Sequence, residues 1–162
     1  DTAYRAMQVK ERLINKNQKE PTVTEIAKEF SPGRPLAQAL WNEPIRECKI
    51  LASMLMPKEE MFPEMAEIWT EEMPTAEIAQ TTVMYLLSKT SWAADTAFQW
   101  IAGEHPMRQL CGYLILARLI SQGTEFNTPS ILEIQDQAEA TLPQADLHLQ
   151  KAIRAVLDRL ET

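Results

Sequence analysis

Glycine, cysteine and histidine are scarce in this 162-residue chain, which has four glycines, two cysteines and two histidines. The shortage of glycine and of β-branched alternation argues against a fold built from β-hairpins. The singly scattered histidines and cysteines show no metal-ligand spacing, so we expect no metal and no cofactor. Cys48 and Cys111 have apolar neighbours, which is typical of reduced core thiols in a cytoplasmic protein.

Long apolar runs are also absent. No run approaches the ~20 residues that a membrane-spanning helix needs, and no leading segment looks like a secretory signal. We therefore expect no membrane association and a cytoplasmic location. The first residue is Asp1 rather than methionine, so we also expect that N-terminal residues of the full-length protein are missing.

What the chain does contain is typical of a globular helical protein. Hydrophobic residues make up 45% and charged residues 24%, which is too apolar for a disordered chain. Ala, Leu, Glu, Gln, Lys and Met dominate, and these residues favour helix. The composition predicts an all-α fold, which we expect to form a single domain over residues 1–162.

Charge is distributed unevenly around a net value of −7. Residues 1–58 carry 10 Lys/Arg against 7 Asp/Glu, residues 59–148 carry 3 against 14, and residues 149–162 carry 3 against 2. The acidic middle argues against strong non-specific DNA binding, which usually needs a basic surface. Residues 59–77 contain seven glutamates and no basic residue, which indicates a solvated face or a docking surface for a basic protein partner.

Helical spacing recurs along the chain. Thr22 and Glu25 form a capping-box pattern that predicts a helix over residues 23–30. Apolar spacing and Pro or Gly breaks predict roughly ten helices with short loops, a pattern typical of stacked helix hairpins. Among the predicted features are a helix from Pro35 to Trp41, a stripe of Met61, Met65, Ile68 and Trp69, helices over 75–89 and 92–102, a most enclosed helix over 110–120, and a left-handed Gly123.

The order and spacing of several short segments resemble the AlkD-like DNA alkylation repair family. These segments are Thr24–Phe30, Ala37–Trp41, Glu47–Leu55, Ile68-Trp69, Met84–Thr90, Ala97–Trp100 and Gly112-Tyr113. The resemblance implies a HEAT-like α-α superhelix, a curved array of antiparallel helix pairs. It also implies an activity, the excision of cationic alkylpurines from DNA by an N-glycosylase.

The resemblance implies a catalytic Trp with an Asp four residues later, on the same face of a helix. As the N-glycosidic bond breaks, such a carboxylate stabilises the positive charge that develops on the sugar. Aligned on Ser88-Lys89-Thr90, this chain has Ala76 at the Trp position and Gln80 at the Asp position, with Glu77 as a substitute only in a shifted register. Further departures are Ala155 at a second Trp position, and Gln109 and Leu110 where arginines are common.

Four basic residues lie nearest the positions that face DNA in this family. They are Lys89, Arg108, Lys151 and Arg154, and each is either a phosphate contact or an ordinary solvated residue. We expect the four tryptophans to be packing residues rather than base-stacking ones. The leading hypothesis is a DNA alkylation repair protein with an eroded glycosylase site that binds duplex DNA, with residual enzyme activity left open. The alternative is a non-enzymatic α-solenoid scaffold for protein–protein interaction.

Overall fold

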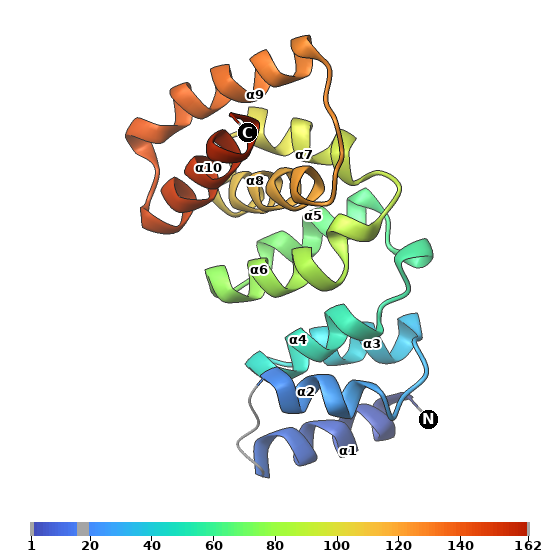
Figure 1. Cartoon of the computed structure of the whole chain (residues 1–162). Helices are drawn as coiled ribbons and strands as arrows, with labels where there is room; N and C mark the ends of the chain where they lie inside the picture. Colours follow the sequence, from blue (N-terminus) through green and yellow to red (C-terminus); the bar gives the residue numbers. More distant parts are fainter. Residues whose placement is uncertain (1, 16–19, 162) are drawn as a thin grey trace. The chain divides into compact units, whose positions relative to one another are not determined.

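The computed structural model describes residues 2–15 and 20–161, and all regular structure in these residues is helical (Figure 1). The predicted all-α fold is therefore confirmed. The chain divides into two compact units, Asp1–Phe62 and Pro63–Thr162, and each is described by itself. The expectation of a single domain stays a prediction.

The described residues of the first unit form helices that pack on one another. Its elements are α1 (Thr2–Asn15), α2 (Glu20–Ala27), α3 (Arg34–Trp41), α4 (Arg46–Leu55) and the 3-10 helix η1 (Lys58–Glu60). Helix α3 begins at Arg34, one residue before the predicted start, and ends at the predicted Trp41, with a proline in its first turn. Helix α2 begins three residues before the predicted start and ends at Ala27, so Thr22 and Glu25 lie inside it. The capping-box prediction is wrong because a proline is tolerated in a first helical turn and does not delay the start.

A buried lysine joins α3 to α4. The side chain of Lys49 is 8% exposed, and its Nζ donates a hydrogen bond of 2.6 Å to the carbonyl oxygen of Trp41, the last residue of α3. The same ammonium lies 4.6 Å from the centroid of the Trp41 ring. Because the cation interacts with both the helix C-terminus and the aromatic face, its burial is compensated.

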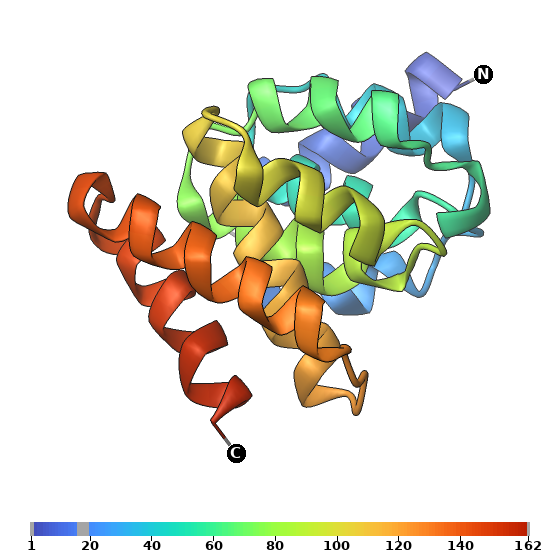
Figure 2. The ribbon, with the colours of Figure 1, turned by 90° about the horizontal axis from the view of Figure 1, so that it is seen from above.

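The second unit is built around α8 (Pro106–Ser121), which packs on α5, α6, α7 and α10. Helix α9 packs on α7 and α10 (Figure 2). The other elements are α5 (Pro63–Glu71), α6 (Ala76–Tyr85), η2 (Leu87–Lys89), α7 (Ala93–Ala102), α9 (Thr128–Thr141), η3 (Leu142–Gln144) and α10 (Leu147–Leu160). The segment predicted to be most enclosed thus lies in the helix at the centre of this unit, although a larger share of the residues of α4 is buried.

Two details of the second unit test the predicted pattern. Gly123 follows α8 with a φ of 98°, so the predicted left-handed residue is confirmed. Ile68 is 55% exposed, so its predicted burial is wrong. Helix α5 buries Ala66, Trp69 and Thr70, and Ile68 therefore falls outside the face that packs inward.

The contact between α7 and α8 depends on the absence of a side chain at Gly112. A Cβ added there would lie 2.8 Å from Cγ2 of Ile101, 3.1 Å from the carbonyl oxygen of Ala97 and 3.3 Å from Cβ of Trp100. All three distances are shorter than ordinary van der Waals contact. Only glycine lets the two helix backbones approach this closely.

We expect Gly112→Ala to lower the free energy of unfolding by about 1–3 kcal/mol, because overpacking outweighs the helix propensity of alanine. Gly103→Ala is the matched control: its Cβ would meet its nearest atom at 3.6 Å, and we expect a change of at most about 0.5 kcal/mol. Urea unfolding of the three chains measures both effects. A Gly112→Ala chain as stable as the native one would contradict the close approach.

Candidate functional site

Helices α6, α8 and α10 begin side by side. Their N-caps are Thr75, His105 and Asp146, whose side chains accept hydrogen bonds of 3.3, 3.3 and 2.9 Å from backbone N–H groups three residues on. These caps satisfy amide donors that the first helical turn leaves open. The first residues of all three helices line one hollow of about 350 Å³, formed by Pro74, Thr75, Ala76, Pro106, Met107, Leu110, Asp146, His148 and Leu149.

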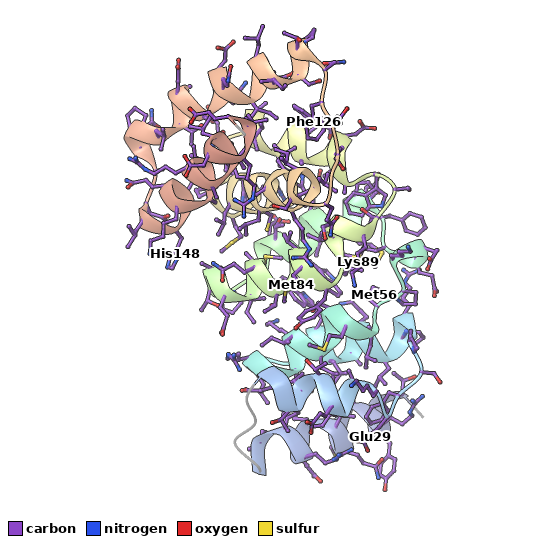
Figure 3. All side chains as sticks on the ribbon, viewed as in Figure 1. Glu29, Met56, Met84, Lys89, Phe126 and His148 are labelled. Atoms are coloured by element: carbon purple, nitrogen blue, oxygen red, sulfur yellow. The ribbon has the colours of Figure 1, made fainter. Side chains whose placement is uncertain are left out.

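Further along the same three helices lies a second hollow, of about 310 Å³. We call it the arginine hollow. Its apolar lining comes from all three helices, and its polar side chains come from Gln80 of α6, Arg118 and Ser121 of α8, and Arg159 of α10. Figure 3 labels Met84 on its α6 wall. The lining residues are Gln80, Val83, Met84, Leu114, Ala117, Arg118, Ser121, Ala155 and Arg159.

The two arginines of this hollow have different hydrogen bonds. Arg159 donates from Nε to Oγ of Ser121 at 2.6 Å and from Nη1 to the carbonyl oxygen of Ala155 at 3.0 Å, which holds its guanidinium across α8 and α10. The Nε of Arg118 is buried and has no hydrogen-bond partner among the described residues. A buried donor left in this state costs about 1–3 kcal/mol, and more in a charged group.

The electrostatic character of the hollow follows from its lining. None of the nine lining residues is acidic and two are arginines, so any group that enters meets positive charge. A unit positive charge about 5 Å from one guanidinium would be destabilised by about 3 kcal/mol at an effective dielectric constant of about 20. The hollow therefore disfavours a cation and favours an anion.

The structure brings together some of the residues expected at a catalytic site. Gln80 and Ala155, 75 positions apart in the sequence, line the same hollow, as expected if both belong to one site. Ala76 lines the neighbouring hollow, one helical turn before Gln80. Glu77 is exposed and lines neither hollow, so it does not bring a carboxylate to this place.

Three of the four basic candidates are exposed. Lys151 and Arg154 lie on α10, and Lys89 ends η2 (Figure 3). Lys151 precedes Ala155 by four residues, which puts it on the same side of α10 as the arginine hollow. Arg154 lies about 100° away from Ala155 around the helix. Their assignment as phosphate contacts stays a prediction.

The fourth candidate, Arg108, holds two helices together. Its Nε donates to Oγ1 of Thr70 at 3.1 Å and its Nη2 to the carbonyl oxygen of Glu67 at 3.1 Å. The same Nη2 lies 3.3 Å from Oε2 of Glu71. These contacts pin the start of α8 to the end of α5, and they already use guanidinium donors that a phosphate contact would need.

Sequence reasoning missed Arg118 and Arg159 as site residues. The one available signal was that Arg118 interrupts an otherwise apolar helix, where a buried charge needs a reason. Arg159 sits among polar residues near the end of the chain and carries no such signal. Only the packing of α8 against α10 brings the two into one hollow.

Other reactive groups give no second centre in the described part of the chain. Cys48 and Cys111 are free and fully buried, and burial raises the pKa of each thiol to about 12. They are core thiols, as predicted, rather than nucleophiles. Within the described residues, no group of three or more His, Cys, Asp or Glu side chains could hold a metal ion, and no helix could span a membrane.

Comparison with known protein families decides the affiliation of the chain. The family described as "DNA alkylation repair enzyme" matches residues 7–160. This chain belongs to the DNA alkylation repair family. The predicted AlkD-like affiliation is therefore confirmed.

The fold of this DNA alkylation repair family member is also found among solved structures. It is similar to a protein described as one of "a new family of proteins related to the HEAT-like repeat DNA glycosylases with affinity for branched DNA structures". The TM-score is 0.77 at 17% sequence identity, over 95% of this chain and 69% of that one. The predicted HEAT-like fold is confirmed by this similarity.

A curated protein also shares a short stretch with this DNA alkylation repair family chain. The RNA polymerase sigma-G factor of Clostridium acetobutylicum is 72% identical over 30 residues, which is 18% of this chain. The chain spans only 12% of the length of that factor. So short a match does not indicate the function of this chain.

In this DNA alkylation repair family member, we expect Arg108→Met to lower the free energy of unfolding by about 1–2 kcal/mol. Most of the loss comes from the hydrogen bonds to α5, because the ion pair with the exposed Glu71 contributes little. Arg154→Met removes the same charge from an exposed position and is expected to change stability by at most about 0.5 kcal/mol. Thermal or urea unfolding measures both. If the two variants were equally stable, that result would contradict the structural role of Arg108.

Proposed function

We propose that this member of the DNA alkylation repair family binds DNA without excising alkylated bases. One observation carries the proposal: the hollow that contains Gln80 and Ala155 is lined by two arginines and by no carboxylate. The proposed partner is duplex DNA, and the proposed location is the cytoplasm, where buried reduced thiols such as Cys48 and Cys111 persist. The proposal requires no metal and no cofactor.

The lack of excision follows from the charge that the reaction develops. Loss of a cationic base leaves positive charge on the sugar, and stabilisation of such charge by an oriented group is commonly worth 10²- to 10³-fold in rate. Gln80 offers a dipole without a charge, and Arg118 and Arg159 oppose the cation. A site of this kind lowers, rather than raises, the rate at which the N-glycosidic bond breaks.

Two observations support DNA as the ligand. The first is membership of the family, and the second is the fold similarity to a protein with described affinity for branched DNA. The exposed Lys151 and Arg154 on α10 are the proposed contacts to neighbouring phosphates, together with Lys89. With so few cations in an acidic unit, binding is expected to be modest and local rather than tight along any duplex.

We expect the native chain to release 7-methylguanine from methylated duplex DNA no faster than a buffer control does. Base release by the native chain would contradict the proposal, and loss of that release in Glu77→Gln would identify Glu77 as the group responsible. Gln80→Asp tests the alignment separately. Release by Gln80→Asp but not by the native chain would place residue 80 at the catalytic position.

DNA binding itself is measured by titrating a fluorescent duplex and a matched four-way junction at several salt concentrations. If about four phosphates are neutralised, affinity should fall roughly a hundredfold between 50 and 200 mM salt, because each contact releases a counterion. A protein that bound neither probe at the lower salt concentration would not be a DNA-binding protein, and this proposal would be wrong.

The second candidate function is a protein-interaction scaffold, and the acidic surface of α5 favours it. Glu64, Glu67 and Glu71 are exposed on this helix, Glu72 is exposed directly after it, and the exposed Ile68 lies among them. An apolar residue surrounded by carboxylates suits a basic amphipathic partner. Absence of DNA binding at low salt is the result that would favour this candidate.

A further inference from the structure

Arg118 differs from Arg108 and Arg159, the two other arginines whose Nε groups lie at contacts of α8. The Nε of Arg108 donates to Thr70 at 3.1 Å, and that of Arg159 donates to Ser121 at 2.6 Å. The Nε of Arg118 is buried in protein and meets no acceptor among the described residues. A buried, charged donor without a partner is costly, so a ligand that supplies the acceptor would gain affinity.

The hollow around Arg118 selects the chemistry of that ligand. Its polar groups are mostly donors: two guanidinium groups, the amide of Gln80 and the hydroxyl of Ser121, which accepts from Arg159 and keeps its own proton to donate. The remaining lining is apolar, and a hydrogen bond from a guanidinium group to an anion is strengthened by the charges of both partners. An anion with several acceptor oxygens fits this arrangement, whereas a cationic base does not.

We propose that the arginine hollow binds a phosphate group of DNA, held between Arg118 and Arg159. Arginine presents a planar fork of donors that matches the oxygens of a phosphate. The apolar lining from Val83, Met84 and Leu114 then contacts the adjoining deoxyribose. This inference rests on the proposed function. It places an anion at the position where positive charge would develop on the sugar in a relative that excises bases.

Two kinds of DNA phosphate could occupy the hollow. A backbone phosphodiester carries one negative charge, whereas a terminal phosphate at a nick or strand end carries about 1.5 to 2 at neutral pH. The two guanidinium groups match the charge of the terminal group more closely. Paired probes that differ only in a 5′-phosphate or a 5′-hydroxyl at a nick distinguish the two sources: equal affinities indicate the backbone, and tighter binding of the phosphorylated nick indicates the terminal group.

The binding test compares the full native chain with Arg118→Gln on these nicked duplexes. We expect Arg118→Gln to lower the affinity for DNA at least about tenfold, because one charged contact is lost. For the same reason, the slope of log affinity against log salt concentration should become shallower by about one. Arg34→Gln is the charge-matched control, since Arg34 is exposed in the other unit, and we expect its affinity within about twofold of the native value. Equal affinities of Arg118→Gln and Arg34→Gln would overturn the inference while leaving DNA binding intact.

A second measurement uses the native chain and does not depend on the folding of a variant. The Nε–H resonance of Arg118, assigned by its loss in Arg118→Lys, is followed by NMR during titration with inorganic phosphate at constant ionic strength. We expect this resonance to shift, while that of Arg108, which already donates to Thr70, does not. An unchanged Arg118 resonance would overturn the inference. If the native chain bound no DNA at all, the proposed function would fall and this inference with it.

Discussion

The packing of α8 is the constraint on which the rest of the second unit depends. Four helices bury α8, and at Gly112 the backbone of α8 comes so close to α7 that a methyl group would clash with Ile101. This contact leaves α8 little freedom to rotate or slide. Arg118 lies six residues beyond Gly112 on the same helix. The position of its side chain therefore depends on the apolar contact between α8 and α7 at Gly112.

Under the function proposed above, the arginine hollow is the family's site with its charge reversed and its helices kept. A glycosylase of this kind needs negative charge beside the sugar, whereas here Gln80 is neutral and the neighbouring charges are positive. The caps at Thr75, His105 and Asp146 still begin the three helices that form the hollow. Scaffold and chemistry are thus separable, because backbone caps and apolar packing set the one and a few lining side chains set the other.

The helices were predictable wherever local signals agreed. Pro35 and the apolar spacing located α3, and the break at Gly123 located the end of α8. Helix α1 was not predicted although its buried Ala6, Val9 and Leu13 follow helical spacing, because the exposed apolar Tyr4, Met7 and Ile14 obscure that stripe. The burial of Ile68 was mispredicted for the related reason that an apolar residue can face solvent.

The sequence by itself determined the helical class and the affiliation with the family, because both depend on the local spacing of residue types. It also predicts Gln80 at the position of a catalytic carboxylate. Only the tertiary structure decided that Arg118 and Arg159 share a hollow with Gln80. Arg118 lies 38 positions after Gln80 along the chain, and Arg159 lies a further 41 positions on. Their proximity arises from the packing of α6, α8 and α10, which no local pattern specifies.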